Sequence, residues 1–236
     1  MADNAGMAAN SADKLSDQPR AAQGTWRVVA LAEVVLSAAA VAFDLFLPTI
    51  VILLLASISL AIRRTGPSSL GFRKVEQPGR MVVAVFVLTI GWSLVQLGLT
   101  MPILNHLTGQ RQNLAQFEGL QGNLTMLLLL LGLSWTLAAL GEETVYRGYI
   151  PTRISEVLGP RRAGLLLAVG ISSALFALAH TEQGVIGVGL TFLDAVFFSV
   201  LKLRFRTLWA AVLAHGFNNT IGMVTFYLIG PIYGLW

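Results

Sequence analysis

Long apolar stretches, separated by short polar segments, make up most of this 236-residue chain. Hydrophobic residues account for 55% of the chain and charged residues for only 12%, which is about half of the roughly 25% that is usual in soluble proteins. A water-soluble fold of this size needs a polar surface that such a composition cannot supply. We therefore expect an all-α, polytopic bundle of transmembrane helices, multi-pass in the cell membrane with the lipid bilayer around it.

The charge balance and the absence of cysteine exclude several functions. The formal net charge is +4 and the isoelectric point is near 9.9. In a membrane protein such a balance is typical of basic loops that face the cytoplasm, so we expect no nucleic-acid partner. Without cysteine the chain has no disulfide, no thiolate metal ligand and no thiol nucleophile.

The apolar stretches predict about seven membrane spans, because one span needs about 20 residues. The first stretch is too long for a single span, and Asp44 and Pro48 near its middle indicate a turn between two short helices. Five of the stretches cover residues 26–62, 81–104, 163–180, 184–201 and 207–229. Another begins near residue 123 and runs into the segment GEETVYRGY. This division predicts a disordered cytoplasmic tail (1–25), N-terminal transmembrane helices and loops (26–122) and a transmembrane core (123–236).

The basic residues lie almost entirely on one side of this arrangement. With seven spans, one side receives 15 of the 16 lysines and arginines, and the other side receives only Arg111. Basic residues collect in the cytoplasmic loops of membrane proteins. The bias therefore predicts that the N-terminus is inside and the C-terminus outside. We also expect the bundle to open toward the cytoplasm, to admit water.

Ionisable residues inside the hydrocarbon layer are costly and therefore suggest function. Glu143 and Arg147 are four residues apart, so on a helix they share a face and can pair. Glu142 is rotated by about 100° from its neighbour and has no such partner in the sequence. A structural ion pair near the cytoplasmic end, with Glu142 solvated, would explain the pattern. The doubled carboxylate weakens that interpretation, because two adjacent anions repel each other.

Two histidines lie in other spans. His180 follows Phe176 by four residues, so the aromatic ring can shield a neutral imidazole that acts as a base. His215 and Asn219 are also four residues apart and project into one cavity, where both can donate hydrogen bonds to a developing oxyanion. Packing of His180 and helix–helix hydrogen bonding of His215 and Asn219 are the alternatives. Asn218 points elsewhere.

The remaining ionisable residues give weaker predictions. Glu33 is expected to face the bundle, Asp44 to lie in a turn and His106 to lie in an outside loop without a role. Asp194 lies in the middle of a span and has no partner in the sequence. It is either buried against a basic or amide group, which we favour, or part of a second functional site.

Several protease chemistries are absent from the sequence. There is no HExxH motif and no Gly-Xaa-Ser-Xaa-Gly elbow, and Asp44 and Asp194 lack the glycine context of an aspartyl dyad. The motifs EETVYR, FALAH and HGFNN instead match EExxxR, FxxxH and HxxxN, in that order and on successive helices. This ordered set resembles the CPBP (Abi) family, which includes the type II CAAX prenyl endopeptidases and bacteriocin-processing or immunity proteins. The resemblance covers roughly residues 124–228, and LGFR at 70–73 resembles a segment that often precedes this core.

The resemblance implies an intramembrane endopeptidase that cuts a membrane-associated, prenylated or leader-type protein or peptide. By motif position, Glu142 and His180 would activate a water, His215 and Asn219 would form an oxyanion hole, and Glu143 and Arg147 would support the site. The family has also been described as metalloproteases, in which case Glu142, His180 and His215 would bind zinc. We favour a route that requires no cofactor, because Asn219 fits oxyanion donation better than zinc ligation.

Two other functions fit the same residues. One is a non-catalytic bacteriocin-immunity or partner-binding membrane protein, and the other is a small transporter whose polar residues line an ion path. Transporters often show repeated halves, which we do not find in the sequence.

The depths that the sequence predicts for the site residues do not agree with one another. At about 1.5 Å per residue, His180 lies roughly 25 Å into its span and Glu142 only roughly 8 Å above Arg147. They meet only if the fifth span tilts or starts further out, or if the fourth carries Glu142 deeper.

Overall fold

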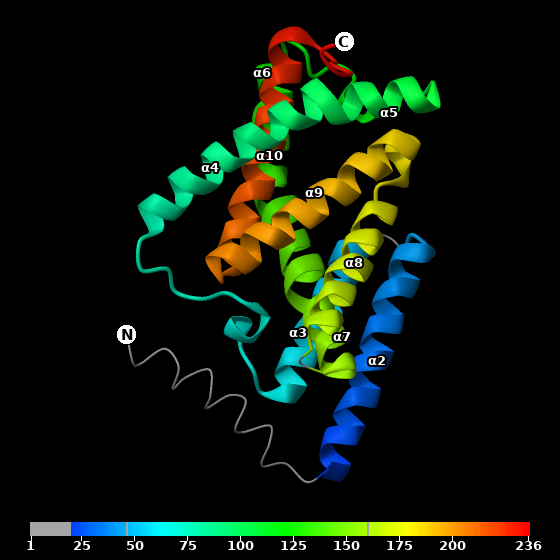
Figure 1. Ribbon diagram of the computed structural model, residues 1–236, viewed down its shortest axis with the longest axis vertical. Coiled ribbons are helices and arrows are strands. Elements are labelled where there is room, and N and C mark those ends of the chain that lie inside the picture. The colour runs from blue at the N-terminus through cyan, green and yellow to red at the C-terminus, as the bar shows by residue number, and fades with distance from the viewer. Residues whose placement is uncertain (1–19, 46, 160) are drawn as a thin grey trace.

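The structure is a computed structural model that describes residues 20–45, 47–159 and 161–236 (Figure 1). Within these residues the chain forms seven continuous helices and no strand. The first three are α2 (Arg20–Ala42), α3 (Pro48–Arg63) and α4 (Pro78–Val95), which continues through the π-helical η2 (Gln96–Thr100) into α5 (Met101–Thr108). The fourth joins α6 (Leu124–Leu133), the π-helical η4 (Ser134–Glu142) and η5 (Thr144–Tyr149), and α7 (Ile150–Leu158). The last three are α8 (Arg162–Leu178), α9 (Gly184–Phe205) and α10 (Leu208–Ile229).

The predicted all-helical membrane bundle is confirmed. Each of the seven predicted spans corresponds to one continuous helix. Four stretches are long and apolar enough to cross a membrane: Gly24–Ala42, Pro78–Thr108, Leu124–Leu158 and Thr181–Phe205. The helix α10 is not among them, because it carries the polar side chains of the third motif. Apolar side chains along α2, α4 and α6 are exposed, as expected for a surface that lipid covers.

Two predicted boundaries were wrong. The third helix does not end near residue 104 but continues to Thr108, so that His106 lies in the last turn of α5 and not in a loop. The fourth helix does not end near Arg147 but continues to Leu158, which carries Arg147 and Arg153 out of the predicted loop. The predicted tail (1–25) lies mostly outside the described residues, and α2 begins within it at Arg20.

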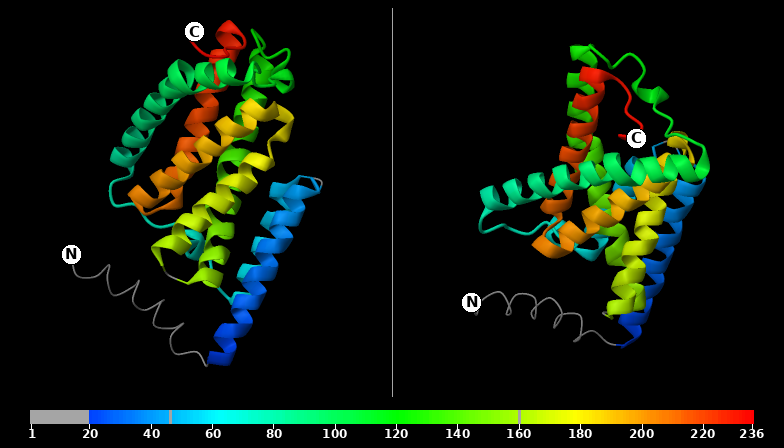
Figure 2. Two further views of the ribbon diagram at one scale, coloured as in Figure 1. Left: turned by 45° about the vertical axis from the view of Figure 1, so that its right-hand side comes forward. Right: turned by 45° about the horizontal axis from the view of Figure 1, so that its top comes forward.

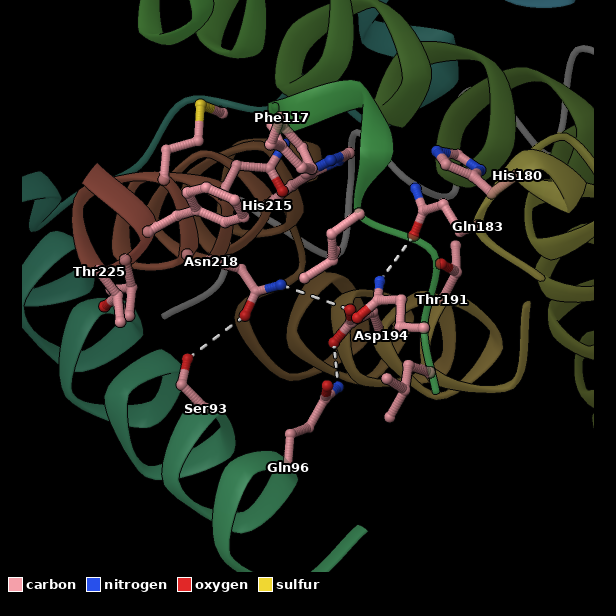
Figure 3. A pocket seen from close by; sticks show the side chains of 18 of the residues that line it. Ser93, Gln96, Phe117, His180, Gln183, Thr191, Asp194, His215, Asn218 and Thr225 are labelled. Carbon is pink, nitrogen blue, oxygen red and sulfur yellow. Dashed lines mark hydrogen bonds between the residues drawn. The ribbon is translucent and has the colours of Figure 1, made fainter. Parts of the chain in front are cut away.

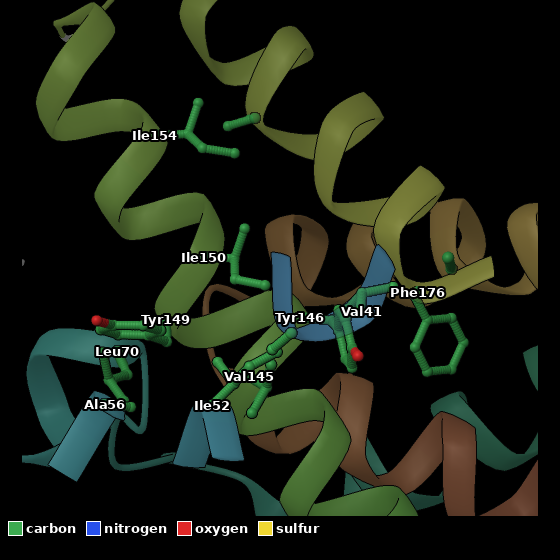
Figure 4. Packing of buried hydrophobic residues seen from close by; sticks show 13 residues of the cluster. Val41, Ile52, Ala56, Leu70, Val145, Tyr146, Tyr149, Ile150, Ile154 and Phe176 are labelled. Carbon is green, nitrogen blue, oxygen red and sulfur yellow. The ribbon is translucent and has the colours of Figure 1, made fainter. Parts of the chain in front are cut away.

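The long helix from α6 to α7 runs through the middle of the bundle (Figures 1 and 2). Its lower half packs against α2, α3 and α8, and its upper half packs against α10. Figure 4 shows the apolar core at this crossing, where Tyr146, Tyr149 and Ile150 of the long helix meet Phe176 of α8 and Ile52 of α3. All five side chains are almost completely buried. The core therefore fixes the helix that carries the first motif.

A buried ion network connects α2 to this core. The Glu33 carboxylate lies 3.3 Å from the Arg63 guanidinium of α3 and 3.2 Å from the Arg153 guanidinium of α7. Both arginines also pair with Glu156, at 2.8 and 2.7 Å. The prediction that Glu33 faces the bundle is therefore confirmed. Asp44 lies in the turn between α2 and α3 with a positive φ of 46°, also as predicted.

Apart from the turn between α2 and α3, the loops form two groups, one toward the bottom and left of Figure 1 and one toward its top and right. One end, here called the basic end, carries residues 64–77, 159, 161 and 206–207, and a hydrogen bond from the Leu208 amide to the Gly71 carbonyl joins the start of α10 to the first of these segments. The other end, here called the carboxyl-terminal end, carries residues 109–123, the turn η6 (Thr181–Gln183) and the chain after α10.

Candidate active site

The first motif lies in a widened part of the long helix. The segments η4 and η5 are π-helical, and such segments are rare and often occur at functional sites. The backbone carbonyls of Tyr146 and Arg147 accept hydrogen bonds from the Ser172 hydroxyl of α8 and the Lys202 ammonium of α9. Carbonyl groups inside a membrane need such partners. The neighbouring helices thus stabilise a backbone shape that the local sequence does not specify.

Glu143 is the most buried carboxylate of the site, with 0% of its side chain exposed. Its Oε1 atom lies 2.8 Å from Nη1 of Arg147, which confirms the predicted pair, and 2.8 Å from Nδ1 of His215. The Arg147 guanidinium also lies over the Phe176 ring, 4.1 Å from its centroid. An ionised carboxylate can only accept hydrogen bonds, so Glu143 holds the proton of His215 on Nδ1.

His215 lies between the two glutamates. Its Nδ1 contacts Glu143, and its Nε2 lies 3.8 Å from Oε2 of Glu142. The Phe198 ring of α9 stacks on the imidazole at 5.1 Å between centroids and 17° between planes. The alternative in which an ion pair near the cytoplasmic end leaves Glu142 solvated does not fit, because the Glu142 side chain is only 17% exposed. In the widened helix, both adjacent carboxylates reach the same imidazole ring.

Glu142 lies deep within the bundle and has one free carboxylate oxygen. Its side chain is 17% exposed, and its Oε2 atom is buried without a hydrogen-bond partner among the described residues. The helix continues for 16 residues beyond Glu142, to Leu158, which corresponds to about 24 Å at 1.5 Å per residue. The sequence left open whether the fifth span tilts or starts further out, or whether the fourth helix carries Glu142 deeper. The structure shows that the fourth helix carries Glu142 deeper.

His180 follows the end of α8 and is held by its own helix. Its Nδ1 lies 2.8 Å from the Phe176 carbonyl, and its ring lies 4.7 Å from the Phe176 ring. Because a carbonyl only accepts hydrogen bonds, Nδ1 carries a proton. In the neutral ring, Nε2 is the acceptor that a base or a water-binding group needs.

Asn219 is positioned by the first part of the widened helix. Its Nδ2 donates to Oγ of Ser134 at 3.1 Å, which leaves its second N–H free. The helix α10 approaches closely because Gly216 has no side chain: a Cβ there would lie 2.4 Å from the Trp135 ring. The Trp135 indole in turn donates to the Thr220 hydroxyl at 3.1 Å. This contact brings the third motif against the first.

One cavity of about 420 Å³ brings the three motifs together. Glu142, His180, His215 and Asn219 all line it, as their spacing in the sequence predicted for His215 and Asn219. In Figure 3, His180 and His215 approach the cavity from different helices. Buried Phe176 and Phe198 form part of the same wall. The lining of the cavity therefore includes a carboxylate, two imidazoles and an amide.

A second polar group forms another wall of the cavity (Figure 3). The Asp194 carboxylate accepts hydrogen bonds from the Trp92 indole at 2.6 Å, the Gln96 amide at 2.5 Å and the Asn218 amide at 3.4 Å. Asn218 also accepts a hydrogen bond from the Ser93 hydroxyl at 3.3 Å. The preferred interpretation, that Asp194 is buried against amide groups, is therefore confirmed. His106 is exposed on α5.

The arrangement does not form a metal site among the described residues. No group of three histidine, cysteine, aspartate or glutamate side chains lies close enough to hold a metal ion. Glu142 and His215 are adjacent, but His180 does not complete a ligand set with them. The site as it stands does not fit zinc.

The fold and the site define an all-helical membrane protein with a buried carboxylate–imidazole group that faces a cavity. Residues 124–221 match the family model for type II CAAX prenyl endopeptidases, described as Rce1-like. The match covers the part of the chain that carries the three motifs, and it supports the resemblance of this core to CAAX-type membrane endopeptidases, which are hydrolases. No curated protein and no solved structure matches the chain.

The sequence did not point to several residues that support the site. Ser134 holds Asn219, Phe198 stacks on His215, and Lys202 binds the widened helix. Serine and phenylalanine are common in membrane helices, so Ser134 and Phe198 carry no signal of their own. Gln96, in contrast, is an amide in the middle of an apolar stretch, and this position could have indicated a partner for Asp194.

Proposed function

We propose that this protein is an intramembrane endopeptidase that hydrolyses a peptide bond of a membrane-associated protein by means of a glutamate-activated water, without a metal ion. The observation that supports this most is the free, buried Oε2 of Glu142, which lies 3.8 Å from His215 Nε2 in a cavity shared with His180 and Asn219. A base with an unoccupied oxygen in a cavity can accept a proton from a water there.

In this proposal Glu142 and His180 hold the nucleophilic water. Both present a hydrogen-bond acceptor, and a water molecule has two protons to donate. The water adds its oxygen to the carbonyl carbon of the substrate as one of its protons moves to Glu142. The apolar walls formed by Phe176 and Phe198 limit competing solvent, which strengthens the electrostatic interactions in the cavity.

His215 and Asn219 stabilise the negative oxygen that forms on the carbonyl carbon. Asn219 uses the N–H that Ser134 does not occupy. His215 donates from Nε2 when both ring nitrogens carry protons, and the Glu143 carboxylate at Nδ1 balances that charge while Glu142 holds the proton from the water. Glu143, paired with Arg147, keeps the imidazole in place. Glu142 then gives its proton to the leaving amine, and the peptide bond breaks.

The substitution Glu142→Gln tests this role, because it removes the base and preserves the size of the side chain. We expect the cleavage rate to fall by about 10²–10⁴-fold, the usual contribution of a general base. The measurement uses the purified protein in lipid nanodiscs, a set of membrane-anchored peptides and detection of the products by mass spectrometry.

The control for that experiment is Glu118→Gln, which changes an exposed carboxylate in the loop before α6. It should cleave at the wild-type rate. Thermal unfolding of both variants checks that the bundle is intact. Wild-type cleavage by a folded Glu142→Gln protein would show that the base has been assigned to the wrong residue.

The metal-free route makes a separate prediction. We expect cleavage to continue at an unchanged rate after treatment with a strong zinc chelator, because Glu142, His180 and His215 do not form a ligand set. The rate is measured before and after dialysis against the chelator, with and without added Zn²⁺. Loss of activity that only Zn²⁺ restores would contradict this route.

A further inference from the structure

The cavity that holds the candidate site extends toward one end of the bundle. Its buried part is formed by His215, Phe198 and Phe176. Its exposed lining residues include Gln116, before α6, and Glu182, in the turn η6. Both belong to the carboxyl-terminal end. None of the described residues in the loops of the basic end lines the cavity.

The rim of the cavity at this end is built from amide groups. The Gln112 side chain donates to the Gln183 side chain at 2.8 Å, and the Asn113 backbone amide donates to the Gln183 carbonyl at 2.8 Å (Figure 3 shows Gln183 and His180 on this side). The Asn113 side chain also donates to the Glu182 carbonyl at 2.9 Å. Amides both donate and accept hydrogen bonds, so this rim suits the backbone of an extended peptide.

The two ends differ in their positive charge. The described loops of the basic end carry Arg64, Arg73, Lys74, Arg161 and Arg206. The segments of the carboxyl-terminal end carry Arg111 alone. Short loops rich in lysine and arginine remain in the cytoplasm. The basic end is therefore the cytoplasmic one, and the cavity extends toward the opposite side of the membrane.

We propose that this cavity opens to the non-cytoplasmic side and takes its substrate there. The substrate class is a polypeptide segment that has been translocated and lies next to its own membrane anchor, and it is not a prenylated tail in the cytoplasm. This orientation reverses the expectation that the bundle opens toward the cytoplasm. The identity of the substrate rests on the proposed endopeptidase activity, whereas the direction of access rests on the cavity and the loop charges alone.

The chain contains no cysteine, so single cysteines can report the direction of access directly. Gln116→Cys places a thiol at the rim, Thr225→Cys places one on the cavity wall, and Ser68→Cys places one on the exposed loop of the basic end. Right-side-out and inside-out vesicles that contain each variant are treated with a maleimide that cannot cross membranes. Labelling in right-side-out vesicles reports exposure to the non-cytoplasmic side.

We expect Gln116→Cys and Thr225→Cys to be labelled in right-side-out vesicles, and Ser68→Cys only in inside-out vesicles. The reverse pattern, or labelling of Thr225→Cys from the Ser68 side or from neither side, would overturn the proposal.

A membrane-anchored peptide presented to each type of vesicle then tests the substrate. Cleavage only from the cytoplasmic side would overturn the substrate class. Correct labelling without cleavage on either side would leave the access intact and reject the endopeptidase function.

Discussion

Glu143 has two partners, one close to it in the sequence and one far from it. Its pairing with Arg147 is local, because the two residues are four apart on one helix. Its contact with His215 joins residues 72 positions apart. Both partners use the same carboxylate oxygen, at 2.8 Å each. Glu143 therefore stabilises the bundle and orients the imidazole at the same time.

The variant Glu143→Gln should be strongly destabilised. It leaves the Arg147 guanidinium, of which only 1% is exposed, without its counter-charge, and removing one partner of a buried ion pair typically costs about 3–5 kcal/mol. The free energy of unfolding, measured by denaturation in detergent micelles, checks this expectation. The exposed Glu118→Gln variant serves as the control and should unfold like the wild type. An unchanged unfolding free energy for Glu143→Gln would contradict the importance of this pair.

The helix α10 owes its position to a contact with the π-helical segment η4. The absence of a side chain at Gly216 lets the Trp135 ring pack against the helix backbone, one residue after His215. Trp135 and Ser134 then bind Thr220 and Asn219 of the same helix. The distance between the first and third motifs therefore depends on this one glycine.

Gly216→Ala should displace Trp135 and move α10 away from Glu142. A Cβ at this position would lie 2.4 Å from the ring, and such overpacking costs about 1–3 kcal/mol. A shift of about 1 Å at a catalytic group can lower the rate by about 10²-fold. The rate of peptide cleavage and the quenching of tryptophan fluorescence report the two effects.

Gly132→Ala is the matched control for this substitution. Gly132 lies in α6, is exposed and does not line the cavity, and a Cβ there has no atom within 4 Å. Cleavage and stability should remain at the wild-type level. Equal losses in the two variants would indicate a general effect of alanine in a helix and not the contact with Trp135.

The whole molecule consists of a core that carries the candidate site and of two helices, α2 and α3, that are attached to it. The helix α2 lies along α7 and contacts it extensively, and the Glu33 network joins α2, α3 and α7 (Figure 2). None of the described residues of α2 or α3 lines the cavity. These helices therefore stabilise the long central helix from outside the cavity.

Glu33→Gln should lower stability and leave the chemistry nearly unchanged. The change removes a charged partner from Arg63 and Arg153, and hydrogen bonds to charged groups contribute about 1.5–3 kcal/mol. Both arginines keep Glu156, so the loss should lie at the lower end of that range. The melting temperature and the cleavage rate below it are the two measurements. A large fall in rate with an unchanged melting temperature would contradict this division of roles.

The amino-acid sequence alone was sufficient to predict the all-helical membrane fold and the number of helices, and it pointed to four residues that line one cavity. These features depend on local patterns: the length of an apolar stretch sets a span, and a four-residue spacing puts two side chains on one helix face. The turn at Asp44 and the pair formed by Glu143 and Arg147 were predicted for the same reason.

The contact of Glu142 with His215, the depth of Glu142 and the end toward which the cavity extends became apparent only in the folded molecule. The widened helix is stabilised by Ser172 and Lys202 from α8 and α9, and Phe198 of α9 fixes the imidazole. Such contacts join distant parts of the chain, and a linear pattern of residues does not encode them. The mouth of the cavity likewise arises from loops that meet only after the seven helices have packed.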